Sequence, residues 1–368
     1  MKICMLTSGH DVFDNRIYYK EILSLKKICK EIYLIAPGDK NFTTQDGIIV
    51  KCFPKRKNWH DRVTPMKNIF DIAYKINADI YHAHEPDSFQ VATKLKAKLK
   101  SKIIYDSHEY YPEAFSEHFK LGKSLAEKIV YLYERKIAKK ANCIITVNSI
   151  LVNKFKKYNK NVRLIPNYPV LKDDYFQKQY DDKPIFIYVG GLREDRGIFK
   201  ILQAINNIKN IDYEYIFIGP FETKEFEYKC KDFIKNNLSN VNIKFTGKIP
   251  HIKVFEYLRS ANVGFVLLQP GNWRYVNSEP IKLFEYMSSE TAVIGSDFPM
   301  IKNILSSTNS GVLVKPDSPG EISSAILKLG KDLEQTRIMG KNGYKSVVKS
   351  YNWKVCENEL IDAYNKLQ

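Results

Sequence analysis

The sequence predicts an α/β protein with two doubly wound, Rossmann-like domains in tandem. At 368 residues the chain is too long for one ordinary hydrophobic core. Short apolar strands alternate with amphipathic helical stretches, and this pattern stops once and then starts again. The longest apolar runs have the length of a strand and are far shorter than the roughly 20 residues of a membrane span.

The first half of the chain predicts a parallel sheet within a domain of residues 1–170. The expected strands are "KICMLT", "EIYLIA", "IIVKCF", "DIYHAH", "KIIYDS", "CIITVN" and "VRLIP". Helical stretches lie between most of them. Across residues 16–30, for example, Tyr18, Ile22, Leu25 and Cys29 fall on one helical stripe. Strands that alternate with helices in this way form parallel sheets covered on both faces.

A linker at residues 171–183 separates the two domains, because the surrounding stretch is rich in proline and aspartate and has no periodicity. The strand pattern then resumes in a second domain, residues 184–351, with "IFIYVGG", "YEYIFIG", "VNIKFTG", "NVGFVLL", "TAVIG" and "GVLV". Residues 352–368 are expected to form a helix that crosses back to the first domain. Ligands of such sheets bind at the carboxyl ends of the strands, so the site is expected between the domains.

The N-terminus and the cysteines favour a cytosolic protein. The first residues, "MKICMLTSGH", lack the length and cleavage site of a signal peptide and are typical of a first strand. The six cysteines are scattered and include no CxxC pair, so we expect reduced thiols.

The charge of the chain is uneven. Residues 1–170 contain 31 Lys and Arg against 17 Asp and Glu, so they carry a net charge of +14 out of the total +17. A lysine-rich composition explains part of this excess but not its concentration in one half. A basic face attracts polyanions, which include nucleic acid, anionic lipid and phosphorylated substrates.

The densest basic run is residues 120–140, which the spacing predicts to be a helix. Its apolar stripe is expected to pack on the core and consists of Leu125, Ile129, Leu132, Tyr133 and Ile137. Packing does not require the basic residues around that stripe. They predict reversible attachment to an anionic membrane surface, since each Lys or Arg near such a surface contributes about 1 kcal/mol.

The stretch "NSEPIKLFEYM", residues 277–287, predicts an anion site at the start of a helix. Pro280 suits the first helical position, with Ser278 or Glu279 as the cap. The free N–H groups of residues 281–283 would then face a ligand such as phosphate. Lys282 in the first turn is favourable only if an anion binds there. On spacing alone, an exposed pair of Lys282 with Glu285 is an equally good interpretation.

A second stretch, "IYVGGLREDRGIFK", predicts a strand, a tight turn and a helix. Gly190 and Gly191 allow close approach of the backbone, and Arg193, Arg196 and Gly197 surround the helix start. This combination indicates a phosphate cradle. The spacing fits neither G-x-G-x-x-G nor the P-loop, which argues against a nicotinamide cofactor and against a P-loop NTPase.

Histidines and acids follow two strands of the first half, in "YHAHEPDSF" and "IIYDSHEYYPEAF". Metal-ligand types are present, but no H-x-x-x-H or H-E-x-x-H spacing and no D-x-D pair occurs, so no metal is expected. His82 is expected to be structural. His108 is expected to be functional, because Asp106 and Glu109 flank it where the strand opens into a loop.

Taken together, these motifs resemble the family 4 glycosyltransferases of the bacterial surface-polysaccharide type. "PIKLFEYM" followed by "AVIGSDFP" is similar to the family's C-terminal signature, and "YVGGLREDRGI" to its first C-domain turn. The motifs "MLTSGHDVFDNRIYYKEILSL", "YHAHEPDSF", "IIYDSHE", "CIITVNS" and "LIPN" occur in the family's N-domain order. The resemblance spans nearly the whole chain.

The resemblance implies a GT-B fold and a retaining transfer of a sugar from a UDP-, GDP- or dTDP-sugar to a saccharide or lipid-linked acceptor, without metal or cofactor. It implies that the first domain binds the acceptor and the second the donor. In the family, a glutamate that matches Glu285 binds the ribose. The donor residues implied are Gly191, Arg193, Arg196, Asn277, Ser278, Lys282, Leu283 and Glu285. His108 is the catalytic candidate, and the acceptor candidates are His10, Asp14, Arg16, His84, Asp87 and Glu109. The expected location is the cytoplasm, with peripheral attachment to the inner face of the cell membrane.

Some residues depart from the family pattern. Asn277 stands where the family often has a sugar-binding glutamate, Gly191 where it has arginine, and Arg196 where it has lysine. The donor sugar therefore stays open, as do a GT-B-fold sugar-nucleotide epimerase and an inactive partner protein as alternatives. A basic nucleic-acid-binding protein is a weaker alternative, because the signature motifs lie outside the most basic half and no RNA-binding motif is visible.

Overall fold

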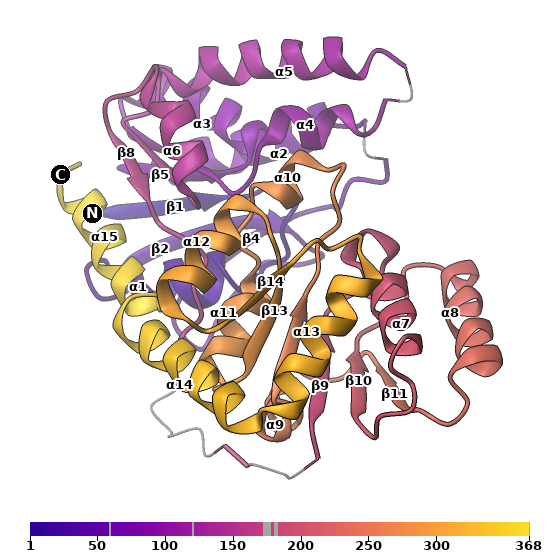
Figure 1. Cartoon of the computed structure of the whole chain (residues 1–368). Coiled ribbons are helices and arrows are strands. Elements are labelled where there is room, and N and C mark those ends of the chain that lie inside the picture. Colours follow the sequence, from indigo (N-terminus) through magenta and orange to yellow (C-terminus); the bar gives the residue numbers. More distant parts are fainter. Residues whose placement is uncertain (59, 120, 172–177, 180–182, 368) are drawn as a thin grey trace. The chain divides into compact units, whose positions relative to one another are not determined.

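The computed structural model describes residues 1–58, 60–119, 121–171, 178–179 and 183–367. The chain divides into two compact units. Unit 1 comprises residues 1–167 and 353–368, and unit 2 comprises residues 168–352. Most of the expected linker, residues 171–183, lies outside the described residues. Figure 1 shows the whole chain with its elements labelled.

Unit 1 contains an eight-stranded sheet in the order β3-β4-β2-β1-β5-β6-β7-β8. Its strands are β1 (Lys2–Leu6), β2 (Glu31–Pro37), β3 (Phe42–Thr43), β4 (Ile49–Phe53), β5 (Ile80–His84), β6 (Lys102–Ser107), β7 (Cys143–Thr146) and β8 (Val162–Leu164). All seven strands expected from the sequence are present and pair in parallel. The two-residue β3 was not expected and pairs antiparallel with β4 at the edge.

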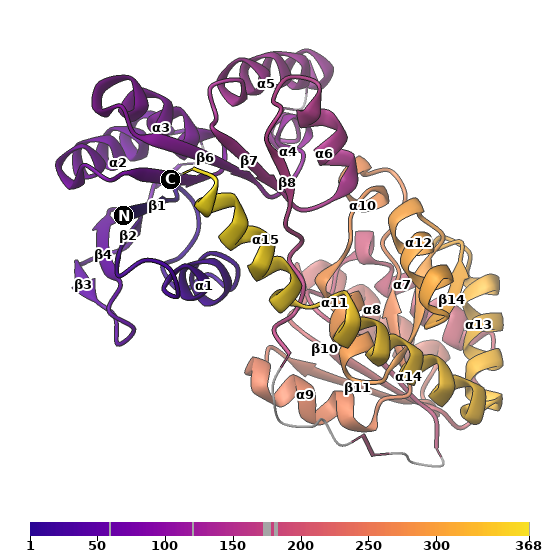
Figure 2. The same ribbon diagram turned by 90° about the vertical axis from the view of Figure 1, so that its left-hand side faces the viewer.

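Helices cover both faces of this sheet. One face packs against residues of α2 (Val63–Ile76), α3 (Pro86–Leu99), α5 (Lys123–Ala138) and α6 (Ser149–Lys156). The short α4 (Tyr111–Ser116) packs on α5. On the other side, η1 (Ile17–Ile22) and α1 (Leu23–Leu25) contact α15 (Trp353–Asn365), as Figure 2 shows. Unit 1 is therefore completed by a helix that follows unit 2 in the sequence.

The helix expected across residues 16–30 is shorter and differently wound. Residues Ile17–Ile22 form a π-helical turn, and a single α-helical turn, Leu23–Leu25, continues it. The stripe itself is correct, because Tyr18, Ile22, Leu25 and Cys29 are all buried. Such π-helical turns occur frequently at functional sites, and this one carries the buried side chains of Lys20 and Glu21.

Unit 2 contains a six-stranded parallel sheet in the order β11-β10-β9-β12-β13-β14. Its strands are β9 (Ile185–Val189), β10 (Glu214–Ile218), β11 (Asn242–Gly247), β12 (Val263–Val266), β13 (Ala292–Ser296) and β14 (Gly311–Val314). One face packs on α7 (Ile198–Asn206), α8 (Lys224–Asn237) and α13 (Pro319–Lys331). The other packs on α9 (His251–Ser260), α11 (Ile281–Ser288), α12 (Pro299–Thr308) and α14 (Leu333–Lys349). The 3₁₀ turn η2 (Glu194–Arg196) and the short α10 (Trp273–Val276) complete the unit.

Helix α11 begins one residue later than the sequence indicates. Pro280 is the N-cap, with φ −66° and ψ 131°, and Ile281 is the first helical residue. The N–H of Leu283 donates to the carbonyl of Pro280 (2.9 Å), so it is already used within the turn. The anion site expected at this helix therefore has fewer free N–H groups than the three that the sequence suggested.

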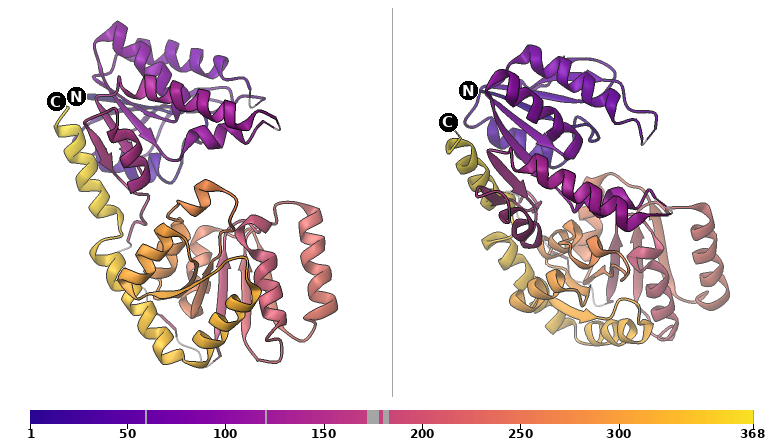
Figure 3. Two further views of the ribbon diagram at one scale, coloured as in Figure 1. Left: turned by 45° about the horizontal axis from the view of Figure 1, so that its top comes forward. Right: turned by 90° about the horizontal axis from the view of Figure 1, so that it is seen from above.

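The apolar stripe of α5 is exposed, so the expectation that it packs on the core was wrong. Leu125, Ile129, Leu132 and Tyr133 are 64%, 58%, 50% and 37% exposed, and of the five stripe residues only Ile137 is buried. Helix α5 lies on the outside of unit 1, above α3 and α4 in Figure 1, and Figure 3 shows it from two further sides. An amphipathic pattern does not reveal what covers its apolar face. Among the described residues, no helix combines the length and the hydrophobicity needed to cross a bilayer.

Candidate active site

In unit 2, two cations converge on the glycine turn that follows β9. Gly190 has a φ of +128°, a backbone conformation that residues with a side chain rarely adopt. A Cβ atom at Gly190 would lie 3.2 Å from Nζ of Lys282 and 3.5 Å from Nη1 of Arg196. The glycine thus leaves space where a lysine of α11 and an arginine of η2 meet.

Lys282 and Arg196 make no ion pair among the residues that the structure describes. The Nζ of Lys282 lies 3.9 Å from the centre of the Tyr188 ring, which gives it a cation–π contact. Burial and, to a smaller extent, the charge of Arg196 lower the pKa of Lys282 to about 7, although Glu285 opposes the shift. Two like charges held together favour a site that an anion neutralises.

The other donor candidates lie around the start of α11, and two of them have local roles. Asn277 ends α10 and donates from Nδ2 to the carbonyl of Trp273 (2.8 Å). The hydroxyl of Ser278 donates to the carbonyl of Tyr275 (3.2 Å). Leu283 is fully buried, whereas Glu285 is half-buried on α11. Of these four residues, Glu285 is the one that has both a charge and access to solvent.

Arg193 is neutralised by its neighbours. Its Nε lies 2.8 Å from Oδ1 of Asp195, and its Nη1 lies 2.8 Å from Oε1 of Glu222. These carboxylates raise the pKa of Arg193. The backbone of Gly191 accepts a hydrogen bond from the Tyr188 hydroxyl (3.0 Å) and so helps to hold the turn. Arg193 therefore has carboxylate partners, whereas Lys282 and Arg196 have none among the residues that the structure describes.

A cavity of about 490 Å³ lies at the same carboxyl edge, and sequence analysis did not find it. It is lined by the turns after β10 and β11, with Phe221 and Phe245 among its walls. The N–H of Gly219 donates to the carbonyl of Gly247 (3.0 Å). A Cβ at Gly219 would lie 2.0 Å from the carbonyl oxygen of Gly190. The cavity wall at Gly219 therefore contacts the glycine turn at Gly190, where Lys282 and Arg196 meet.

In unit 1, His108 belongs to a buried ionic network. Its Nε2 lies 3.0 Å from Oδ2 of Asp106, and the guanidinium of Arg16 lies 3.2 Å from the same oxygen. Arg16 also lies 2.8 Å from Oε1 of Glu21. Burial alone would raise the pKa of Asp106, but Arg16 and His108 outweigh it and hold that pKa well below its usual range. Asp106 is therefore ionised and fixes both partners.

His82 and His84 lie side by side on β5, with ring centres 4.5 Å apart. Nδ1 of His82 lies 2.8 Å from the hydroxyl of Tyr364 on α15, which gives His82 the structural contact expected of it. Nδ1 of His84 lies 3.2 Å from Nε2 of His108. Burial lowers the pKa of both His82 and His84, so these rings are neutral near pH 7.

His10 and Asp14 join the network through Glu85. His10 lies 3.0 Å from Asp14 and 3.3 Å from Oε1 of Glu85. Although burial lowers the pKa of His10, these two carboxylates outweigh it and raise that pKa. The hydroxyl of Thr7 and the N–H of Ser8 also donate to Glu85 (2.6 and 3.2 Å). Glu85 has φ 73° and ψ 157°, a region that costs a residue other than glycine about 1–3 kcal/mol.

Glu85 is thus a residue that sequence analysis did not select, although its place between a strand end and Pro86 was a signal. Two other acceptor candidates lie nearby. Asp87 forms an ion pair with Arg62 (3.0 Å), and Glu109 follows β6 with its carbonyl accepting from the hydroxyl of Ser107 (3.3 Å). The structure brings His10, Asp14, Arg16, His84 and His108 into one network, with Asp87 in the first turn of α3 and Glu109 in the loop after β6.

Two protein-family models match the chain, one for each unit. Residues 25–168 match "Glycosyltransferase Family 4", and residues 172–346 match "Glycosyl transferases group 1". The chain is a glycosyltransferase of the family 4 type. A glycosyltransferase of Methanocaldococcus jannaschii, itself described as uncharacterised, is 23% identical to it over 338 residues, which are 82% of this chain and 81% of the relative.

Solved structures establish the fold of this glycosyltransferase. Sucrose-phosphate synthase from Thermosynechococcus elongatus superposes with a TM-score of 0.76 at 17% identity, over 100% of this chain and 98% of the other. HepE from Anabaena, solved in complex with UDP, superposes with a TM-score of 0.75 at 12% identity, over 100% of both chains. With its two parallel-sheet units, the glycosyltransferase has the GT-B fold.

Proposed function

We propose that this glycosyltransferase transfers a sugar from a nucleotide diphosphate to a hydroxyl of a saccharide or lipid-linked acceptor, with retention of configuration. The observation that carries the proposal is the convergence of Lys282 and Arg196 on Gly190 at the start of α11. A diphosphate would supply the negative charge that this pair lacks. The helix dipole of α11 adds to the attraction, since the N-terminus of a helix favours anions.

The rest of the nucleotide fits the same edge of unit 2. Glu285 accepts charge-assisted hydrogen bonds from the ribose hydroxyls in this proposal. The cavity beside Gly219 takes the base, because the aromatic rings of Phe221 and Phe245 offer flat apolar contacts. HepE, which shares the fold, was solved with UDP. In this proposal the three parts of a nucleoside diphosphate occupy three subsites at the carboxyl edge of the unit 2 sheet.

Catalysis rests on stabilising the leaving group. As the bond to the sugar breaks, negative charge builds up on the diphosphate, and Lys282 and Arg196 face that charge in a partly buried site. The acceptor attacks from the face that the diphosphate leaves, and the departing oxygen takes the acceptor proton. His108 orients the donor sugar or the acceptor. No metal ion is needed at the diphosphate, because the two side chains and the helix terminus replace it.

Unit 1 binds the acceptor in this proposal. The side chains available are those of the network around His108, namely His10, Asp14, Arg16, His84, Asp87 and Glu109. Their mixture of fixed charges and hydrogen-bonding atoms suits the hydroxyls of a saccharide. The resemblance of "PIKLFEYM" to enzymes of surface-polysaccharide assembly supports a role in that process, where acceptors are often carried by lipids.

Helix α5 attaches the enzyme to the anionic inner leaflet of the cell membrane. Its exposed leucines and isoleucine lie among exposed basic side chains, which are Lys123, Lys128, Arg135, Lys136, Lys139 and Lys140. An exposed apolar stripe with a basic rim is typical of helices that lie in a membrane interface. Such attachment would bring unit 1 close to a lipid-linked acceptor.

The proposal is tested by donor binding. We expect one of the UDP-, GDP- or dTDP-sugars to raise the thermal stability of the purified enzyme, since binding at a hundredfold excess over Kd adds about 2.7 kcal/mol. Product analysis with that donor then reads the anomeric configuration. Stabilisation by none of the donors would contradict the proposal. Conversion of the donor without an acceptor would identify an epimerase instead.

A further inference from the structure

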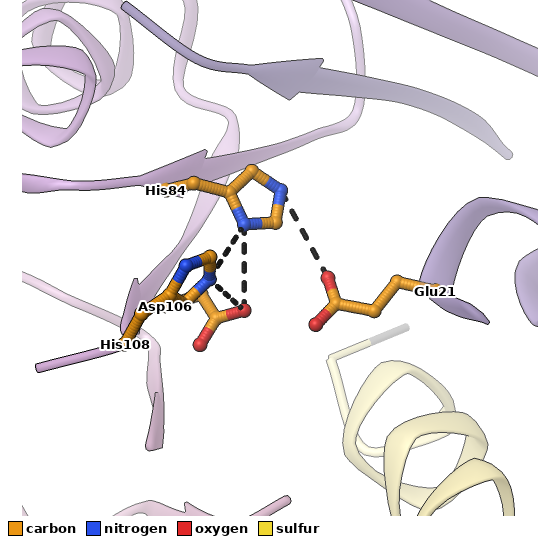
Figure 4. A group of neighbouring side chains, drawn as sticks. All are labelled: Glu21, His84, Asp106 and His108. Atoms are coloured by element: carbon orange, nitrogen blue, oxygen red, sulfur yellow. Dashed lines mark hydrogen bonds and ion pairs between the residues drawn. The ribbon is translucent and has the colours of Figure 1, made fainter. Parts of the chain in front are cut away.

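Four buried side chains of unit 1 converge on one point. They are Glu21 from η1, His84 at the end of β5, Asp106 near the end of β6, and His108 in the loop that follows (Figure 4). One ligand-type atom from each lies within 4.8 Å of the others. Glu21, His84 and Asp106 have fully buried side chains, and that of His108 is 15% exposed. The cluster is therefore enclosed, with one member at its edge.

Three of the four atoms have the spacing of ligands around a single ion. Nε2 of His108 lies 3.0 Å from Oδ2 of Asp106, and Nδ1 of His84 lies 3.4 Å from that oxygen. The two nitrogens are 3.2 Å apart. Ligands bound at about 2.1 Å to one ion lie about 3 to 3.5 Å from one another, depending on the angle. The triangle thus matches one face of a metal coordination sphere.

Two buried atoms of this cluster lack a hydrogen-bond partner among the described residues. Nε2 of His84 and Oε2 of Glu21 are buried, lie 3.9 Å apart and have no hydrogen-bond partner. If Nδ1 of His84 binds an ion through its lone pair, its proton resides on Nε2 and faces the carboxylate of Glu21. Histidines bound to metals are usually oriented by a carboxylate in this way. An ion would therefore explain the position of Glu21.

We infer that Glu21, His84, Asp106 and His108 form a binding site for one divalent transition-metal ion. His84, Asp106 and His108 are the ligands, and Glu21 closes the site against Nε2 of His84. Two imidazoles with carboxylates select Zn²⁺, Fe²⁺ or Co²⁺ over Mg²⁺ and Ca²⁺, which prefer oxygen. The sequence argument against a metal considered ligands along one helix, whereas these come from neighbouring strands and a helical turn.

The site shares His108 with the proposed function, but none of its residues belongs to the proposed donor site in unit 2. It lies in unit 1, while the cations that face the diphosphate lie in unit 2. Ligation by Nε2 of His108 leaves Nδ1 of the same ring for contact with a sugar hydroxyl. The ion would fix the orientation of that ring. The test therefore reads metal binding directly and does not need turnover.

The experiment counts ions on the purified full-length chain. The chain is expressed with added Zn²⁺, or stripped with a chelator and incubated with Zn²⁺ or Co²⁺, and then freed of unbound ion by gel filtration. We expect one ion per chain by elemental analysis, with visible absorption from bound Co²⁺ and no retention of Mg²⁺. His84→Asn and His108→Asn should weaken Zn²⁺ binding at least a hundredfold. Glu21→Gln should weaken it about tenfold to a hundredfold, as expected of an outer partner.

His118→Asn is the matched control, because His118 is an exposed histidine of the same unit and should leave binding unchanged. If His84→Asn, at a buried strand position, does not fold by circular dichroism, His108→Asn in the loop decides the matter. Failure of the wild type to retain an ion after either loading would overturn the inference. So would equal retention by the wild type and His108→Asn, or equal retention of Mg²⁺ and Zn²⁺.

Discussion

The two units build their polar edges in opposite ways. In unit 1, positive and negative groups are interleaved, and Arg16 bridges Glu21 and Asp106. In unit 2, Lys282 and Arg196 have the same sign and meet at Gly190. The first arrangement fixes side chains through internal partners, whereas the second lacks a charge that a ligand can supply. This difference supports the proposal that unit 1 positions groups and that unit 2 captures an anion.

The largest effect is expected at Glu285 in unit 2. If its carboxylate accepts hydrogen bonds from the ribose, Glu285→Gln should weaken donor binding by about 1.5–3 kcal/mol, which is about tenfold to a hundredfold in Kd. Isothermal calorimetry with the donor found by screening measures this. Asp212→Asn, at an exposed ion pair with Lys183 that precedes β10, is the control for a lost surface charge. Unchanged affinity in the folded Glu285 variant would remove that residue from the site.

A variant of His108 tests the proposed role of unit 1. If unit 1 positions the reacting groups, His108→Ala should lower kcat more than about tenfold and change donor affinity little. Steady-state kinetics and calorimetry separate the two effects. A variant with near-normal turnover would assign His108 a structural role. A large loss of donor affinity would instead contradict the division of labour between the units.

The pH dependence of donor binding tests whether the pair of Lys282 and Arg196 binds the diphosphate. The pKa of Lys282 is about 7 in the folded protein, so the lysine loses its proton as the pH rises through 7. Donor affinity should therefore fall by up to about tenfold per pH unit above that point. Lys282→Arg keeps its charge, and its profile should stay flat between pH 6 and 9. A flat profile in the wild type would show that Lys282 does not face the diphosphate.

The same pKa has a consequence for stability. The unfolded chain holds the proton of Lys282 up to about pH 10.5, whereas the folded chain releases it near pH 7. The unfolded state therefore binds more protons between these values, and the free energy of unfolding should rise with pH across that window. In Lys282→Met this contribution should disappear. Denaturant titrations of the two proteins at several pH values measure the difference.

Binding to vesicles tests the proposed membrane attachment and whether it depends on the more basic unit 1. The wild type should sediment with anionic vesicles at low salt and be released at high salt, because charges are screened within about 10 Å at 0.1 M. Replacing Lys128 and Lys136 on α5 by Gln should reduce binding several-fold. The same change at the exposed Lys331 and Lys345 of unit 2 is the control. Equal binding to neutral vesicles would exclude the electrostatic mechanism.

The smallest effect is expected from added divalent cations. If Lys282 and Arg196 face the diphosphate, added Mg²⁺ or Mn²⁺ should not change turnover when the donor is saturating. Loss of activity in EDTA that Mg²⁺ restores would mean that a metal bridges the donor phosphates. Retention of Zn²⁺ by unit 1 is measured separately, by elemental analysis of the same samples.

Local patterns predicted the elements, because strands and amphipathic helices depend on nearby residues. The thirteen strands expected from the sequence are all present, and the glycine turn and α11 lie where the motifs indicated. The meeting of Lys282 with Arg196 could not be predicted, since it depends on packing between segments 86 positions apart. The exposure of Leu125 and Ile129 was also missed, because periodicity shows an apolar face but not its neighbour. The strained backbone of Glu85 follows from the tertiary contacts with Thr7 and Ser8 that hold it.

Unit 1 is assembled from two separated segments of the chain, and this affects its folding during synthesis. Trp353 donates to the hydroxyl of Ser24 (2.9 Å), and Tyr364 pairs with His82. Both aromatic residues emerge from the ribosome only after the 185 residues of unit 2, residues 168–352. At 5–20 residues per second this is a delay of about 10 to 40 seconds. Unit 2 is continuous and needs no later segment of the chain, whereas the buried histidines of β5 must wait for α15. The order of folding is therefore expected to run opposite to the order of synthesis, with the unit whose translation begins first being completed last.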